Sequence, residues 1–509
     1  MPLISRIRPE QLVERRWQLL ALTSVGAFMG PLDGSIVAVA LPRMGQDLKL
    51  TFTASIWVQA IYLLVMAVLL IPLGRLADRR GRVHYYLGGV VVFTVGSLLS
   101  AMSTTDAWLI ASRALQGVGA ALLVATSTAI VTAVFPPRER GRALGINVMA
   151  VYLGLTVGPP LGGFLTDHLG WRSIFFVNIP IGVVVAVCGF LLLPRHERGD
   201  ERAAGSDPLG TCLWALALIC LLVPLTFASE WGWTSARTLG LLATAAAALI
   251  VFAAVELRHR TPLLNLDLVF HNRLFAAANG AALLNYMALG AITILTADFL
   301  EIVQHHSAGL TGWLMLAQPV MMATLSPFAG RLSDRVGSRL LSSGGMVVMA
   351  AGMVLLATVP PTSSLLRVMG SLAVVGLGMA AFSAPNTSAI MGSVEKHQLG
   401  LAGAFVGTMR VTGQSLSVAV LGGIAASFLG PLGSRMLLRL GNPVPGQSHA
   451  AAIAAAAHVA LDYTHGYREA ILTGAALAFV GALLSLTRGP HAPRRAPAAA
   501  RPSRLGAEG

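Results

Sequence analysis

Long apolar stretches separated by short charged clusters run through the whole sequence. Fourteen stretches reach the length of about twenty residues that a helix needs to cross the hydrocarbon core of a bilayer. In lipid the backbone must satisfy its own hydrogen bonds, so uninterrupted apolar runs predict helices, whereas a membrane barrel would show short alternating strands. The predicted spans are 17–38, 55–74, 84–104, 107–134, 142–166, 173–194, 208–228, 237–257, 275–303, 311–330, 340–359, 364–392, 401–429 and 467–487.

Composition and charge exclude a soluble enzyme. Hydrophobic residues make up 55% of the 509 residues and charged residues only 11%, against about 25% charged residues in soluble domains. Most of the 36 Lys and Arg residues lie in alternate loops on one side, together with both termini. The positive-inside rule therefore predicts a multi-pass protein of the cytoplasmic membrane with both termini cytoplasmic. This asymmetry explains the net charge of +14 without a nucleic-acid partner.

An internal repeat divides the chain into two similar halves. The segment 74–81 (GRLADRRG) recurs at 330–337 as GRLSDRVG, and Trp57 and Trp313 precede the two copies at the same distance. Both copies lie on the predicted cytoplasmic side. We therefore predict an all-α membrane protein with two parallel six-helix halves, which rock against each other around a cavity at mid-membrane.

The repeat and the spans together predict the division of the chain. We expect a cytoplasmic N-terminus (1–16), an N-terminal six-helix bundle (17–194) and an inserted helix pair with its flanking loops (195–260). A C-terminal six-helix bundle (261–487) with an outer loop (430–466) follows, then a tail (488–509) whose Ala, Pro and Arg content predicts disorder. The sequence indicates no function for the inserted pair.

Two charged residues inside predicted spans are candidates for proton handling. Asp33 lies about two-thirds along the first span, where burial penalises the charged form of a carboxyl group. Such an acid can take up and release a proton. Arg113, in the fourth span, keeps its charge and must face a partner or water. The alternative for both residues is a structural ion pair or a helix-fixing contact.

Small residues in the fifth span predict a close helix contact. Gly154, Gly158 and Gly162 repeat every four residues, and Pro159 follows the second of them. Small residues let membrane helices approach closely, and proline removes a hydrogen bond and bends the helix. The stripe is compatible with a kinked, leak-tight interface and equally with plain helix packing.

The two repeated loops predict a conformational gate on the cytoplasmic side. Asp78 can cap a helix or pair with Arg79 or Arg82, and the glycines relax the backbone or simply form turns. The candidate gate residues are Gly74, Arg75, Asp78, Arg79, Gly81 and Arg82 in the first half and Gly330, Asp334, Arg335 and Gly337 in the second.

Polar side chains elsewhere in the spans are candidates for a substrate cavity. Asp298 and Glu301 lie three residues apart near the outer end of the ninth span. They can attract a cationic substrate or serve as a second proton site, or they can simply mark the helix end. The full set of cavity candidates is Gln59, Tyr62, Gln116, Tyr286, Asp298, Glu301, Gln318 and Arg410.

In their order and spacing, these motifs resemble those of the fourteen-span drug:proton antiporter family of the major facilitator superfamily. The resemblance covers roughly residues 17–487 and includes the stretches 32–42, 57–63, 113–117, 154–163, 171–180 and 400–410. It implies that Asp33 and Arg113 take part in proton coupling and that the glycine stripe belongs to an antiporter. Val83 stands where the family usually has a second basic residue, and Asp298 and Glu301 replace an apolar residue and a glutamine.

The resemblance implies a proton-coupled exporter of amphipathic, cationic or lipophilic drug-like compounds that works by alternating access. The alternative is a carrier for a specific solute, lipid or endogenous metabolite. HExxH, GxSxG and P-loop motifs are missing from the sequence, which argues against an enzyme and an ATP-driven pump. We expect no metal or cofactor, with the proton gradient as the energy source. The expected partners are a small-molecule substrate, protons and the bilayer; we expect a monomer, and a periplasmic adaptor stays open.

Overall fold

The computed structural model describes residues 16–192, 207–259, 262, 264, 266–395, 399–436 and 449–488, and the elements within these ranges are all helices. The first half comprises α2 (Arg16–Leu48), α3 (Phe52–Arg80), α4 (Arg82–Ala101), α5 (Asp106–Val134), α6 (Pro137–Leu169), α7 (Ser173–Phe176) and α8 (Asn178–Leu192). Two helices then form a hairpin, α9 (Pro208–Trp231) and α10 (Ala236–Glu256).

The second half begins with the short helix α11 (Leu266–His271). It continues with α12 (Arg273–Leu289), α13 (Ile292–Asp298), the π-helical turn η1 (Phe299–Val303), α14 (Ala308–Met315), α15 (Ala317–Val336), α16 (Ser338–Ala357), α17 (Leu365–Gly392), α18 (Leu399–Met436) and α19 (His449–Leu486). Within the described ranges, 14 helical segments are long and apolar enough to cross a membrane. This confirms the predicted fourteen-span, all-helical fold.

Breaks divide the ninth and tenth spans into shorter helices. In the ninth span α12 ends just before Gly290, and the freed backbone N–H of Ala291 donates to Ser417 Oγ at 2.8 Å. The π-helical turn η1 follows α13 and ends the span. In the tenth span α14 ends at Met315 and α15 begins at Ala317. At the break in the ninth span, a side chain from a neighbouring helix thus satisfies a backbone group that a continuous helix would pair internally.

The segment predicted as an outer loop, 430–466, is helical over much of its length, which corrects that prediction. Helix α18 continues to Met436 and α19 begins at His449. The alanine-rich start of α19 has high helix propensity. However, this run is too short to indicate a membrane span, and polar residues follow it. Residues 1–15, 193–206, 437–448 and 489–509, which include the predicted termini and part of the insert's flanking loop, lie outside the described residues.

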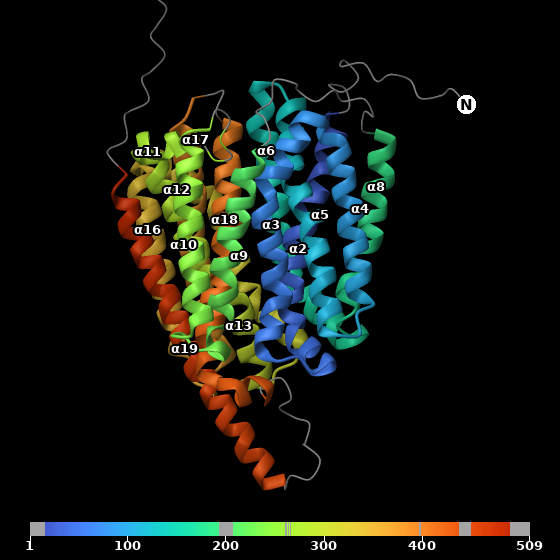
Figure 1. Ribbon diagram of the computed structural model, residues 1–509, viewed down its shortest axis with the longest axis vertical. Helices are drawn as coiled ribbons and strands as arrows, with labels where there is room; N and C mark the ends of the chain where they lie inside the picture. Colours follow the sequence, from blue (N-terminus) through green and yellow to red (C-terminus); the bar gives the residue numbers. More distant parts are fainter. Residues whose placement is uncertain are drawn as a thin grey trace, which may run out of the picture.

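The two halves repeat the same packing. Helix α5 packs against α3 and α4 in the first half, as α17 packs against α15 and α16 in the second. Figure 1 shows the halves side by side, with the helices running roughly parallel. In the inserted pair, α9 packs against α3 of the first half and α18 of the second, and α10 packs against α9. The inserted pair therefore covers one side of the seam between the halves.

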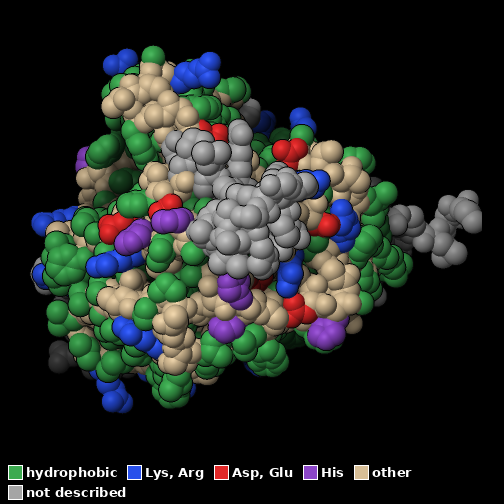
Figure 2. Space-filling model, turned by 90° about the horizontal axis from the view of Figure 1, so that it is seen from below, with side chains coloured by type: hydrophobic (Ala, Val, Ile, Leu, Met, Phe, Trp, Pro, Cys, Tyr) green, Lys and Arg blue, Asp and Glu red, His purple; other side chains and the backbone are tan. Residues whose placement is uncertain are grey.

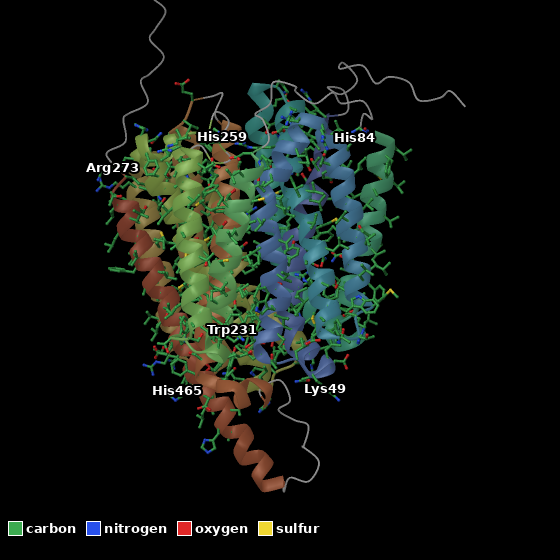
Figure 3. All side chains as sticks on the ribbon, viewed as in Figure 1. Lys49, His84, Trp231, His259, Arg273 and His465 are labelled. Atoms are coloured by element: carbon green, nitrogen blue, oxygen red, sulfur yellow. The ribbon has the colours of Figure 1, made fainter. Side chains whose placement is uncertain are left out.

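The ends of the bundle carry different residues. We call the end where α2 begins and α19 finishes the terminal end, and the opposite one the distal end. His84, His259 and Arg273 lie near the terminal end and Lys49, Trp231 and His465 near the distal end (Figure 3). Seen from the distal end, basic, acidic and histidine side chains gather on the face and hydrophobic ones surround it (Figure 2). Charge at the ends and apolar flanks suit a protein that spans a bilayer.

Candidate functional site

Asp33 lies about midway along α2 and is fully buried inside the first half. Its carboxylate accepts three side-chain hydrogen bonds: from Arg113 Nη1 at 2.5 Å, from Gln116 Nε2 at 2.7 Å and from Asn178 Nδ2 at 3.0 Å. The donors belong to α5 and α8, so this one acid joins three helices. Buried charge is tolerated where it is both paired and hydrogen-bonded, and Asp33 meets both conditions.

Arg113 is as deeply buried as its partner. Besides Asp33, its guanidinium donates to Gln116 Oε1 at 2.5 Å, to the backbone oxygen of Val58 at 3.1 Å and to Gln59 Oε1 at 3.3 Å. These acceptors lie on α3 and α5. The arginine is therefore fixed in one orientation by groups of two helices in addition to the carboxylate.

Aromatic rings close the space around the ion pair. The guanidinium carbon of Arg113 lies 4.4 Å from the ring centroid of Tyr62 and 5.8 Å from that of Phe175. Both rings are buried, and the Tyr62 hydroxyl donates to the backbone oxygen of Gly30 at 3.4 Å. Cation–π contact adds to the attraction, and the rings keep water from the Asp33–Arg113 contact.

The charge of Arg113 depends on Asp33 for compensation. Asp33 is the only carboxylate that Arg113 contacts in the described network, and its other acceptors are neutral oxygens. A buried guanidinium with neutral partners alone is strongly unfavourable in a dry interior. Loss of the negative charge of Asp33 would therefore favour movement of Arg113 or entry of water.

Of five residues around the ion pair, the sequence predicts three as functional candidates and misses two. Gln59, Tyr62 and Gln116 are predicted above as cavity residues, and the structure places all three around Arg113. Asn178 and Ser97 were not predicted; Ser97 Oγ accepts from Gln116 Nε2 at 2.8 Å. The signal for Asn178 was its place in a family-like stretch at the start of α8, whereas nothing in the sequence distinguishes Ser97.

The glycine stripe of α6 faces α2 beside the buried acid. A Cβ added at Gly154 would lie 2.6 Å from the backbone oxygen of Phe28, and one added at Gly162 would lie 2.8 Å from that of Ile36. At Gly158 it would collide with Ser35 Oγ. The stripe thus allows α6 to lie directly against the turns of α2 that carry Asp33.

Another face of α6 contacts the second half near the distal end. The carbonyl group of Pro159 lies where a side chain at Gly312 would be, and Gly163 packs in the same way against the backbone of Ala308. Asp167 Oδ2 accepts a hydrogen bond from Gly309 N at 2.7 Å. Helix α14 is the distal part of the tenth span. Helix α13 is the distal part of the ninth span, and it packs against α2. The two halves therefore meet closely at the distal end.

The first gate loop contains an ion pair and turns at a glycine with positive φ. Arg82 Nε lies 2.6 Å from Asp78 Oδ1, which settles the predicted choice of partner in favour of Arg82 rather than Arg79. Gly81, with φ of 110°, ends α3 and begins α4. A side chain there would be strained. Arg75 donates to the backbone oxygen of Pro262, so this loop contacts the segment that follows the inserted pair.

The second gate loop repeats the backbone of the first. Gly337 has φ of 91° and its N–H donates to Ser333 O at 2.9 Å, as Gly81 N donates to Ala77 O. Gly74 packs near Ala125, whereas Gly330 has open space where a side chain would be. Arg335 is exposed, and the side chain of Asp334 lies outside what the structure describes.

In the second half, two cavity candidates lie where the halves meet. Tyr286 on α12 is within electrostatic reach of Arg410 on α18. Close by, the hydroxyl of Tyr152 on α6 lies 2.9 Å from that of Ser383 on α17. This hydrogen bond crosses from one half to the other. Gln318, the third candidate, packs its backbone against Gly376.

Of the two acids of the ninth span, Asp298 is buried and Glu301 is partly buried. Asp298 is 2% exposed and lies against the Tyr463 hydroxyl, which also donates to Leu295 O at 3.0 Å. Glu301 lies in η1, and its Oε1 is buried with no hydrogen-bond partner among the described residues. They are therefore not simply a solvated helix end.

Metal ligation has no support in the part of the chain that the structure describes, where no group of three or more His, Cys, Asp or Glu side chains could hold an ion. The three cysteines are free.

Comparison with known proteins identifies the family. The sequence profile of the Major Facilitator Superfamily matches residues 23–278 and 274–507. The chain belongs to the Major Facilitator Superfamily. It is 33% identical to the riboflavin transporter RibZ of Clostridioides difficile over 82% of this chain and 90% of that protein. It is 36% identical to the multidrug resistance protein Stp of Mycobacterium tuberculosis, over 81% and 77%.

A solved structure shares the fold. The inward-facing, unoccupied form of a bacterial homologue of the human lysosomal transporter Spinster superposes with a TM-score of 0.65, at 17% identity, over 94% of this chain and 99% of that one. The superfamily and the fold predicted from the motifs are thus confirmed. The chain is a membrane transporter of this superfamily rather than an enzyme.

Proposed function

We propose that this transporter exports amphipathic, cationic or lipophilic drug-like compounds across the cytoplasmic membrane in exchange for protons. The observation that carries the proposal is the sealed contact between Asp33 and Arg113. A proton on the carboxylate removes its electrostatic attraction for the arginine, so in this proposal proton uptake is coupled to helix movement. The proton gradient is the energy source in this proposal; no cofactor is needed and a monomer suffices.

The proposed orientation places the terminal end in the cytoplasm, because basic residues concentrate in the loops on that side. The distal end then faces outward, and the close contacts of α2 with α13 and of α6 with α14 close the outer side. Opening these contacts would admit a proton to Asp33. Release of Arg113 and renewed closure would then return the proton to the cytoplasm as alternating access proceeds.

A methionine-rich cluster supports a broad substrate range. Met322, Met346 and Met379 are buried in one cluster of the second half, and Tyr152 and Leu155 of the first half pack against it. Methionine side chains are flexible and polarisable, so they adapt to differently shaped apolar ligands. The similarity to the multidrug resistance protein Stp points in the same direction.

A second candidate is a carrier for one specific solute. The similarity to the riboflavin transporter RibZ favours it, because that relative is named for a single compound. The two candidates differ in the breadth of compounds transported and in the dependence on protons.

Transport into everted membrane vesicles tests the proposal. Uptake of a fluorescent cationic dye should collapse when nigericin dissipates the pH gradient, and the variants Asp33→Asn and Arg113→Ala should lose gradient-driven uptake. Asp462→Asn, which removes an exposed carboxylate of α19, is the matched control and should transport normally.

Two results would count against the proposal. Dye uptake that is unchanged by collapse of the pH gradient and by Asp33→Asn and Arg113→Ala would refute proton coupling through Asp33. Gradient-driven uptake of riboflavin, together with indifference to a panel of lipophilic cations, would favour the specific carrier instead.

A further inference from the structure

A cavity lies between the inserted pair and the first half, outside the interface between the two halves. Its volume is about 720 Å³ and its walls come from α3, α5 and α9. This volume is within the ~300–1,000 Å³ range of small-molecule sites. Helix α9 belongs to the inserted pair, which so far has no function.

One wall of the cavity is a continuous row of aromatic rings. The rings of Trp57 and Phe227 stack with centroids 5.6 Å apart and an interplanar angle of 24°, and those of Phe227 and Trp231 stack at 5.2 Å and 11°. The row extends from a buried tryptophan on α3 to a partly exposed one at the end of α9. Such a wall suits a flat aromatic ligand, because rings attract one another in offset or stacked pairs.

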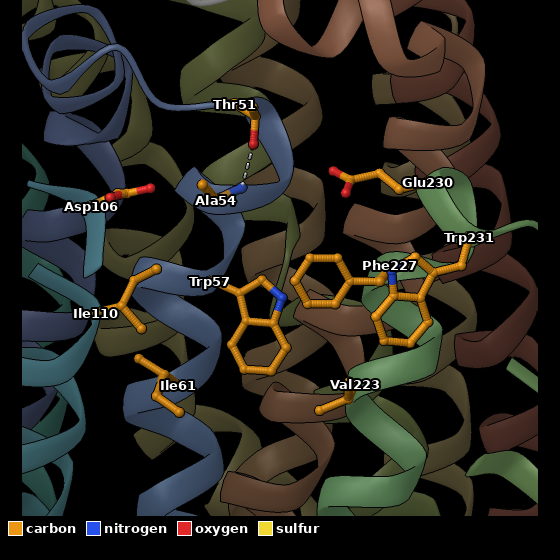
Figure 4. Close-up of a pocket in the computed structure, with 10 residues that line it drawn as sticks. All are labelled: Thr51, Ala54, Trp57, Ile61, Asp106, Ile110, Val223, Phe227, Glu230 and Trp231. Carbon is orange, nitrogen blue, oxygen red and sulfur yellow. Dashed lines mark hydrogen bonds between the residues drawn. The ribbon is translucent and has the colours of Figure 1, made fainter. Parts of the chain in front are cut away.

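Two carboxylates lie at one end of this cavity. Asp106 is in the first turn of α5 and Glu230 is near the end of α9, both at the distal end of the bundle and both exposed. Figure 4 shows them on either side of the cavity at the same end, with the rings below them and Ile61 and Val223 at the other end. The lining includes these two acids and no Lys or Arg. A positive charge is therefore favoured at the rim and an apolar body further in.

A buried donor without a partner points to a ligand in the same cavity. Trp57 is only 8% exposed, and its indole Nε1 has no hydrogen-bond partner among the described residues. An unpaired buried N–H is unfavourable. A ligand that places an acceptor oxygen beside the indole would satisfy it.

We propose that this cavity is a second binding site, for planar aromatic cations that also carry an acceptor oxygen. The cationic amine lies between Asp106 and Glu230, the fused rings lie against Phe227 and Trp231, and the oxygen accepts from Trp57 Nε1. The site uses none of the groups around Asp33. It gives the inserted pair a function, which is to form one wall of a ligand site at the distal end.

Calorimetric titration of the purified full-length protein with doxorubicin tests this site, because doxorubicin combines fused rings, carbonyl oxygens and a protonated amine. Trp231→Leu should weaken one class of doxorubicin sites by roughly fivefold to tenfold, as expected for loss of an aromatic contact to a cationic ligand. Trp233→Leu is the matched control; it removes an exposed tryptophan two residues further on that does not line the cavity, and it should bind as wild type.

The charge of the ligand is tested with doxorubicinone, the neutral aglycone. Wild-type protein should prefer doxorubicin at this class of sites. Asp106→Asn combined with Glu230→Gln should abolish that preference, whereas Asp462→Asn, which neutralises an exposed acid of α19 outside the cavity, should retain it.

The outcomes separate this inference from the proposed transport function. Asp33→Asn should leave the titration of this class of sites unchanged even where it abolishes transport. Unaltered binding in Trp231→Leu and in the double acid variant would overturn the inference, as would an equal loss in Trp233→Leu.

Discussion

At the scale of single residues, the energetic cost of buried charge explains why so many groups surround Asp33. Its three hydrogen-bond donors, together with the four oxygen acceptors and two aromatic rings around Arg113, replace the water that both groups lose on folding. Buried ion pairs contribute little net stability, but removal of one partner is costly because the other is left alone. The pair therefore suits a switch better than a structural support.

The first prediction follows from that asymmetry. Arg113→Gln should leave Asp33 as an uncompensated buried anion and lower the free energy of unfolding by about 3–5 kcal/mol. Adding Asp33→Asn to the same protein should recover much of that loss, since no buried charge is then unpaired. Thermal unfolding of the three variants in one detergent measures the difference, and strictly additive losses would contradict the coupling.

The second prediction concerns Asn178. Replacing it with leucine removes one donor to the Asp33 carboxylate, which disfavours the charged form. The pH profile of dye efflux should therefore shift towards alkaline values. Asn285→Leu, at a buried asparagine of the second half, is the control. It should cost stability without moving the profile; an equal shift in both variants would rule out a specific role of Asn178.

The two charged centres of this site were predictable from the sequence, but their surroundings were not. Asp33 and Arg113 are conspicuous because charge is rare inside apolar spans. Helical periodicity shows that Gln116 shares a face with Arg113, but it does not show which helix that face contacts. Asn178 reaches Asp33 only because α8 packs against α2, a long-range contact that local patterns do not determine.

At the scale of elements, α6 connects the acid-bearing helix to the other half. One of its faces places Gly154, Gly158 and Gly162 against α2, and another places Pro159 and Gly163 against α14. A shift of α2 would therefore be transmitted to the distal contact through this one helix. The glycines matter here for the close approach they permit.

The third prediction tests this close approach. Gly158→Ala places a methyl group on Ser35, so α2 and α6 must separate, and we expect a loss of roughly 1–3 kcal/mol in unfolding free energy, as for other overpacked sites. Gly145→Ala, in the same helix but with open space around its Cβ position, should be neutral or slightly stabilising. Thermal unfolding distinguishes the two, and equal stability would show that the interface relaxes without cost.

The number and type of elements were predictable, but their internal breaks were less so. Apolar length alone yields fourteen spans. The interruption before Gly290 involves Ser417, which lies far away in the sequence. The π-helical turn at 299–303 likewise is not marked by apolar length. The early start of α19 was missed because its alanine-rich run favours a helix without marking a membrane span.

At the scale of the whole molecule, the halves are joined most closely at the distal end. Val39 of α2, Ala297 of α13 and Ala308 and Met315 of α14 form one buried apolar cluster there. The backbone contacts of α6 with α14 lie beside it. Apolar contacts of this kind can open and close reversibly at modest cost, which is what the proposed outer gate requires.

The fourth prediction concerns this distal contact. Gly312→Val would drive a side chain into the carbonyl of Pro159, so the distal end should stay open. In a background in which Cys188, Cys212 and Cys220 are replaced, a cysteine at Ala297 should then react several times faster with a membrane-impermeant maleimide added outside intact cells. Efflux should fall in parallel, because a carrier that cannot close its outer side cannot complete the cycle.

Gly344→Val serves as the matched control for that experiment, because this glycine lies in α16 of the same half with open space where a side chain would be. It should leave both labelling and efflux unchanged. If Gly312→Val labels no faster than Gly344→Val, the contact between α6 and α14 does not hold the outer side closed. The closure would then depend on the apolar cluster of α2, α13 and α14 alone, and substitutions there rather than at Gly312 would open the molecule.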